Sequence, residues 1–94
     1  MTNNNQPVLP LPCFVCGVDF DRIPGGPDNM PDGGNIFTAT GNYGSTVFDP
    51  MTNDCSLEIN ICADCLQKHR ERTIMVRTEI TRIRIVEPWT GQSE

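Results

Sequence analysis

Apolar and polar residues alternate regularly over residues 56–61, "SLEINI". On an extended chain, Leu57, Ile59 and Ile61 share one face, and the polar residues share the other. This period of two predicts a β-strand.

Two shorter apolar segments precede this strand. "NIFTAT" at 35–40 combines β-branched and aromatic residues and predicts a strand, and "TVF" at 46–48 is expected to return beside it as a hairpin. The stretches between and after them, 41–45 and 49–54, are rich in Gly, Asn, Asp and Pro and predict turns. Before them, Gly and Pro interrupt residues 19–35, which predicts a loop.

A helix is predicted from Cys62 to about Arg72. Cys62, Cys65, Leu66 and His69 recur at the spacing of one helix face. The basic residues of this stretch fall mostly on other faces and towards its end, where they suit the negative pole of a helix. The second cysteine pair therefore lies at the start of the predicted helix.

The following segment, 73–86, "TIMVRTEITRIRIV", is crowded with Thr, Ile and Val and predicts extended chain. Its apolar residues lie on one face as far as Ile80, whereas Ile83 and Ile85 lie on the other. The change occurs near residues 81–82, where no Gly or Pro is present to form a hairpin. We therefore expect one long C-terminal strand with a bulge, or one whose two halves have different partners.

Two C-x2-C pairs, Cys13 with Cys16 and Cys62 with Cys65, form the strongest chemical signal in the chain. Cysteines three residues apart on a turn or a helix start can place both sulfurs about 2.3 Å from one ion. Two such pairs complete a tetrahedron, which predicts one structural Zn²⁺, although iron suits the same ligands. Two disulfides, or a thioredoxin-like redox pair, are the alternatives; the second needs a βαβ context that is not seen.

Two further residues near this site have less definite roles. Cys55 is expected to be a small, partly buried turn residue outside the ligand set, or else a substitute ligand or a reactive thiol. His69 is expected to pack or to form a hydrogen bond beside the metal, or else to replace a cysteine as ligand. No nucleophile with a base and no phosphate-binding loop is apparent, so the chain is not expected to be an enzyme.

Length and charge narrow the class of protein. The 94 residues favour one domain, which we expect at 13–89, with a disordered segment at 1–12 and a flexible tail at 90–94. The net charge is −5, with about −7 in residues 1–65 and +2 in the remainder. No secretory signal and no apolar stretch of membrane-spanning length is seen, which favours a cytoplasmic protein with reduced thiols.

The order of cysteine knuckle, loop, β-hairpin and cysteine-bearing helix over residues 13–72 resembles the treble-clef and zinc-ribbon classes of zinc modules. "FTATGNYGSTVFD" followed by "LEINICADCL" also resembles small bacterial and phage proteins with a Gly-Tyr-Gly-Ser turn and a final C-x2-C. This chain departs from that pattern, because Asn42 separates Gly41 from Tyr43 and Cys55 is additional. The resemblance implies a small, metal-stabilised α+β fold, and the predicted C-terminal strand lies outside a minimal treble clef.

Function is expected to reside in the segment after the helix. A β-branched strand beyond a small zinc core has an open edge, which suits a protein partner or a second copy added as a strand. The expected partner surface consists of Ile83, Ile85, Arg77, Arg82 and Arg84. The alternative is a nucleic-acid-binding zinc module that uses the basic residues of segment 68–84, against which the acidic total charge argues. Neither a membrane nor a small-molecule substrate is expected.

Overall fold

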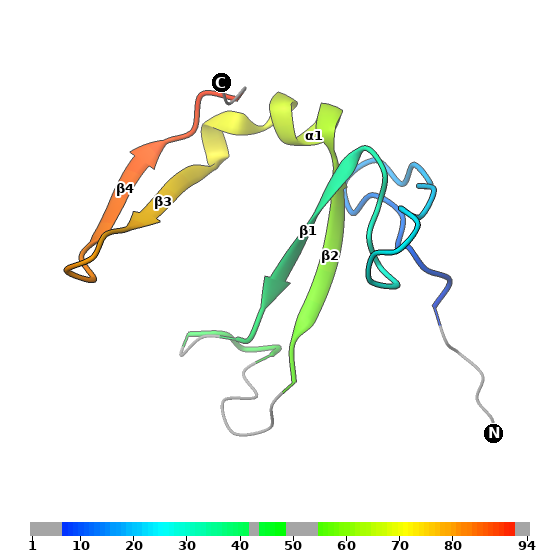
Figure 1. Cartoon of the computed structure of the whole chain (residues 1–94), viewed down its shortest axis with the longest axis horizontal. Coiled ribbons are helices and arrows are strands. Elements are labelled where there is room, and N and C mark those ends of the chain that lie inside the picture. Colours follow the sequence, from blue (N-terminus) through cyan, green and yellow to red (C-terminus); the bar gives the residue numbers. More distant parts are fainter. Residues whose placement is uncertain (1–6, 42–43, 49–54, 92–94) are drawn as a thin grey trace. The chain divides into compact units, whose positions relative to one another are not determined.

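The computed structural model describes residues 7–41, 44–48 and 55–91, and the chain divides into two compact units, Met1–Cys62 and Ala63–Glu94 (Figure 1). Each unit contains one pair of antiparallel strands within its described residues. The bounds of a single domain at 13–89 remain a prediction. In the parts of the chain that the structure describes, no helix has the length and apolar character needed to cross a membrane.

The first unit is built on strands β1 (Gly34–Ala39) and β2 (Leu57–Cys62), which pair from Gly34 opposite Cys62 to Ala39 opposite Leu57. Both predicted strands, at 35–40 and 56–61, are confirmed within one residue at each end. In this pairing, the end of β2 that carries Cys62 lies beside the start of β1.

The strand predicted at 46–48 is wrong. The described residues around it, 44–48, contain no strand, and β2 is the partner of β1 instead. The Ser45 hydroxyl accepts hydrogen bonds from the backbone N–H groups of Val47 (3.2 Å) and Phe48 (2.9 Å). These local bonds occupy donors that a strand ladder would need, so the segment folds as a turn. The turn predicted at 49–54 lies outside the described residues, as does part of the turn at 41–45.

Burial along β2 does not follow the alternation of apolar and polar residues. Leu57 is 50% exposed, whereas Asn60, on the polar side of the alternation, is 0% exposed. Residue Cys13 forms an isolated parallel bridge to Asn60, so the first cysteine pair lies alongside the end of β2. Asn60 is buried because chain from the N-terminal part of the unit, including Leu11, bonds to it, whereas Ser56 and Glu58 on the same side of the alternation stay exposed.

Residues 19–35 form an ordered loop that returns on itself. Arg22 and Pro31 form an isolated antiparallel bridge, and Asp32 N donates to Asp21 O at 2.8 Å. Beyond it, Gly34 opens β1 directly against Phe20; a Cβ at Gly34 would lie 2.8 Å from the Phe20 ring. The predicted loop is therefore confirmed, and its glycine at the strand start is needed for a close approach.

The second unit begins with helix α1 (Ala63–Lys68), followed by a 3₁₀ turn, Arg70–Arg72. The predicted helix, Cys62 to Arg72, was thus too long and too regular. Its first residue belongs to β2, and its last turn tightens at His69, whose carbonyl accepts from Arg72 N at 2.9 Å. Thr73 is extended and ends the helical stretch, in keeping with the β-branched residues that follow.

The single C-terminal strand predicted over 73–86 is wrong. The chain instead forms a hairpin of β3 (Ile74–Thr78) and β4 (Arg84–Pro88), paired from Ile74 opposite Pro88 to Thr78 opposite Arg84 (Figure 1). The reversal uses Arg82 in the left-handed conformation, with φ of 65°, and its N–H donates to Glu79 O at 2.7 Å. The change of apolar face near residues 81–82 therefore marks a turn that no glycine announces.

Candidate metal centre

The first cysteine pair lies on a tight turn, "CFVCG". Gly17 N donates to Cys13 O at 2.9 Å, and Cys13 N donates to Val18 O at 2.8 Å, which closes the turn on both sides. Gly17 has φ of 83°, a conformation that L residues with a Cβ rarely adopt. The turn places Cys13 and Cys16 on one short arc of backbone, as a two-sulfur knuckle requires.

Three backbone N–H groups converge on the sulfur of Cys13. The donors are Val15 at 3.4 Å, Cys16 at 3.5 Å and Cys62 at 3.3 Å. Burial raises the pKa of the Cys13 thiol, but the hydrogen bonds from Cys16, Cys62 and Val15 outweigh it and lower the pKa from 9.0 to about 6. A thiolate is the form that ligates metals, so the fold prepares this sulfur for a cation before one binds.

The second pair lies where the chain passes from strand to helix. Cys62 is the last residue of β2, and Cys65 lies in the first turn of α1. The Cys65 carbonyl accepts His69 N at 3.1 Å, so the backbone around the fourth sulfur is helical. The two cysteines are three positions apart in the chain, which keeps their sulfurs within reach of one ion.

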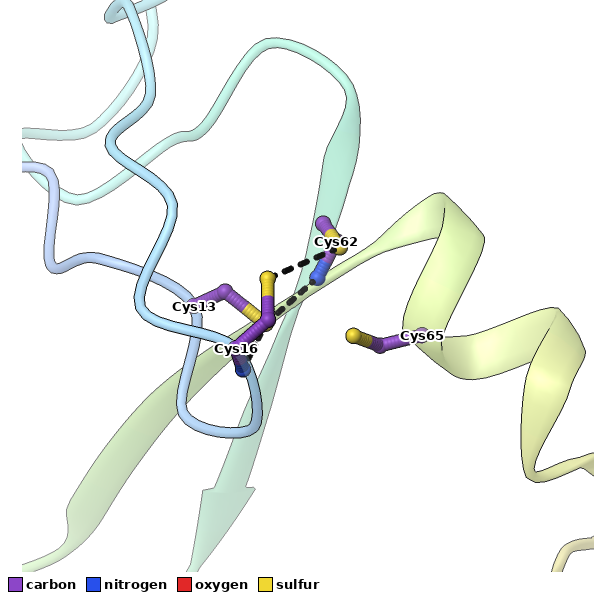
Figure 2. Close-up of side chains that lie close together, drawn as sticks. All are labelled: Cys13, Cys16, Cys62 and Cys65. Atoms are coloured by element: carbon purple, nitrogen blue, oxygen red, sulfur yellow. Dashed lines mark hydrogen bonds between the residues drawn. The ribbon is translucent and has the colours of Figure 1, made fainter.

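The structure brings all four predicted ligands together. The sulfurs of Cys13, Cys16, Cys62 and Cys65 lie within 4.8 Å of one another, and those of Cys16 and Cys62 are 3.8 Å apart (Figure 2). A tetrahedron with metal–sulfur bonds of about 2.3 Å has edges of about 3.8 Å. The four side chains therefore fit a four-coordinate metal with a small contraction, and they can hold one ion.

Accessibility differs among the four. Cys13 and Cys65 are buried, at 3% and 8% exposure, whereas Cys16 is exposed and Cys62 is half-buried. Figure 2 shows the four sulfurs turned towards a common centre. A solvent-borne ion or chelator therefore approaches from the Cys16 side.

The other residues singled out from the sequence lie outside this cluster. Cys55 is exposed, and neither it nor the half-buried His69 is among the four grouped side chains. Of the expected partner surface, Ile83 is 60% exposed and Ile85 is half-buried. Arg77 forms ion pairs with Glu79 (3.9 Å) and Glu87 (3.6 Å), so part of the basic charge is compensated locally.

Sequence reasoning missed one feature of the site, a buried pair of asparagines. Asn29 and Asn60 are 6% and 0% exposed and hydrogen-bond to each other beside the knuckle. Asn29 lies in the loop of residues 19–35 and Asn60 on the polar face of a strand, where an exposed side chain is the usual expectation. Nothing in the local pattern of either segment indicates that they meet.

Comparisons with known proteins add no relative. No protein-family model matches the chain, and no significant match was found among curated proteins or among solved structures. The described residues show a small fold with two antiparallel strand pairs, one short α-helix and a four-cysteine cluster that can hold a metal ion. The resemblance to treble-clef modules and to bacterial or phage proteins stays a prediction.

Proposed function

We propose that this chain is a non-enzymatic interaction module stabilised by one structural Zn²⁺. The observation that carries the metal part is the convergence of four cysteine sulfurs within 4.8 Å. Four thiolates are the ligand set of many structural zinc sites, and zinc accepts the tetrahedral arrangement without strain. Four protein ligands leave no coordination position for water or substrate, which supports a structural role rather than a catalytic one.

Zinc would supply stability that apolar burial does not. Among the described residues, the buried hydrophobic core consists of two cysteines, Cys13 and Cys65, both in the metal cluster. Fifteen large apolar residues in the described part of the chain are exposed, including Leu57 and Ile74. A chain with so little core usually depends on a metal, a disulfide or a partner.

The proposed interaction element is the β3–β4 hairpin. All five residues of β3 are exposed. Ile74 and Val76 are 52% and 43% exposed, and their cross-strand partners Pro88 and Val86 share the same face. An apolar two-stranded ribbon is marginal alone in water, so added strands or a covering partner would stabilise it. A second copy of this chain, adding strand to strand, is the partner that we propose.

The assembly is tested with the double variant Val76→Asp/Val86→Asp, which alters the apolar face just described, compared with Thr81→Asp as a control in the exposed turn of the same hairpin. Native mass spectrometry and sedimentation report mass and metal content together. We expect the double variant to be monomeric with one zinc per chain, and the control to assemble as the wild type does. Normal assembly of the double variant, or a monomeric wild type at all concentrations, refutes self-association.

The nucleic-acid alternative is tested separately. Among the described residues, Arg77 of the hairpin pairs with two glutamates, whereas Arg82 and Arg84 form no ion pair. A module that neutralised several phosphates would show affinity falling steeply with salt. A filter-binding titration with short duplex and single-stranded probes at two salt concentrations decides; we expect no binding at low salt.

A further inference from the structure

The deepest side chain among the described residues is an amide. Asn60 has 0% exposure, and Asn29, from a loop 31 positions earlier, is almost as deeply buried at 6%. A buried amide without hydrogen-bond partners destabilises the fold, because it loses its bonds to water and gains none in return. Both amides must therefore be paired, and the pairs they make determine which segments the fold holds together.

The two amides bond to each other reciprocally. Asn29 Nδ2 donates to Asn60 Oδ1 at 3.1 Å, and Asn60 Nδ2 donates to Asn29 Oδ1 at 2.9 Å. The remaining hydrogen of Asn29 Nδ2 goes to Glu58 Oε1 at 3.0 Å. The second hydrogen of Asn60 Nδ2 goes to Leu11 O, so all four amide hydrogens of the pair are used.

The same pair holds the chain just before the first cysteine. Leu11 N donates to Asn29 Oδ1 at 2.8 Å, and Leu11 O accepts from Asn60 Nδ2 at 2.9 Å. Leu11 falls in the segment 1–12 that the sequence predicts to be disordered, yet both of its backbone groups are bonded. The two asparagines thus attach the approach to the knuckle to β2.

This attachment continues into the metal centre. Two residues after Leu11, Cys13 bridges Asn60, and Phe14 N donates to Asn60 O at 2.7 Å. Two residues after Asn60, Cys62 N donates to the sulfur of Cys13 at 3.3 Å. These contacts lead from the amide pair to the Cys13 sulfur and the Cys62 backbone, and none of them involves a metal.

We infer that Asn29 and Asn60 are positioning residues that assemble the Cys13 half of the metal centre against Cys62 before the metal binds. This rests on the proposed zinc function and names the residues that determine its affinity. A site that is only fractionally assembled binds more weakly in proportion to the competent fraction. Weaker assembly should then lower the rate constant for Zn²⁺ association and leave the dissociation rate constant unchanged, because the metal-bound state is the same.

The test is Asn60→Asp in the full chain, with Asn35→Asp as the matched control, since Asn35 lies exposed on the neighbouring strand β1. The substitution keeps the shape of Asn60 but replaces the donor to Leu11 O and Asn29 Oδ1 by an acceptor. Zn²⁺ affinity is measured by competition with a chromophoric chelator, and rates by stopped flow. Co²⁺ spectra report whether four thiolates still surround the metal.

We expect Asn60→Asp to weaken Zn²⁺ binding roughly 10–100-fold, the usual effect of losing a group that orients metal ligands. The association rate should fall by that factor, with the dissociation rate and the four-thiolate Co²⁺ spectrum as in the control. Asn29→Ala is the second variant, because it leaves Asn60 its bond to Leu11 O. If neither variant folds with saturating zinc, the pair serves the whole fold and the inference is overturned.

The remaining outcomes separate this inference from the proposed function. A wild type that binds no zinc refutes the function itself. A wild type that binds zinc through four thiolates, with both variants matching Asn35→Asp in affinity, overturns only the positioning role. A loss confined to faster dissociation, with an altered Co²⁺ spectrum, also overturns it, because the pair would then act on the bound ligand set.

Discussion

Thermal stability should depend steeply on free zinc. A bound metal would join Cys16 to Cys62, 46 residues apart, and closing a flexible connection of that length costs about 3 kcal/mol. Because so few apolar side chains are buried, metal binding should offset most of that cost. Above the dissociation constant, each tenfold increase in free zinc adds about 1.4 kcal/mol of stability. For a domain of this size, that corresponds to a rise in the unfolding midpoint of about 6–11 °C.

The assay is circular dichroism melting in zinc buffers that span several decades of free metal. Cys55→Ser is the matched control and should reproduce the wild-type dependence, because Cys55 lies outside the cluster. Cys65→Ser removes one buried ligand and should shift the onset of stabilisation to free zinc about a hundredfold higher or more. An unfolding midpoint that stays constant between excess chelator and saturating zinc would refute the structural role of the metal.

Three further predictions concern single residues. The pKa of the Cys13 thiol is lowered from 9.0 to about 6, so its thiolate should stabilise the metal-free fold fully above pH 9 and lose that contribution as pH falls towards 6. Thiolate absorbance should show one titration step near pH 6, which Cys13→Ser abolishes. Arg82→Gly should increase the free energy of unfolding by up to about 1 kcal/mol and so raise the melting midpoint, because φ at this position is 65°. Arg82→Val should lower both. Gly34→Ala should cost about 1–3 kcal/mol in chemical denaturation, since the new Cβ meets the Phe20 ring; an unchanged midpoint would contradict that packing.

The cysteine cluster was predictable because its geometry is largely local. Each C-x2-C pair needs only a tight turn or a strand-to-helix junction to bring its two sulfurs together, and neighbouring residues in the sequence determine both of these local structures. Strand β2 was predictable for a similar reason, since six alternating residues leave few other conformations that separate apolar from polar side chains.

The hairpin and the buried amides were not predictable by the same reasoning. The turn depends on Arg82 in a conformation that sequence rules reserve for Gly or Asn, so the change of apolar face was interpreted as a bulge. Asn60 is buried because distant chain bonds to it, and alternation within β2 says nothing about which segment will cover each face. The turn was therefore missed because its local conformation is unusual for Arg, whereas the burial of Asn60 was missed because it depends on tertiary contacts.

The reciprocal amide pair constrains how this sequence can diverge. Each asparagine supplies a donor and an acceptor that only another amide, similarly oriented, can match, so a change at one position leaves the other unsatisfied. Residues 29 and 60 should therefore be retained or replaced together across descendants of this chain. Two asparagines 31 positions apart, framed by two C-x2-C pairs, form a sparse pattern by which distant relatives could be identified when the rest of the sequence has drifted.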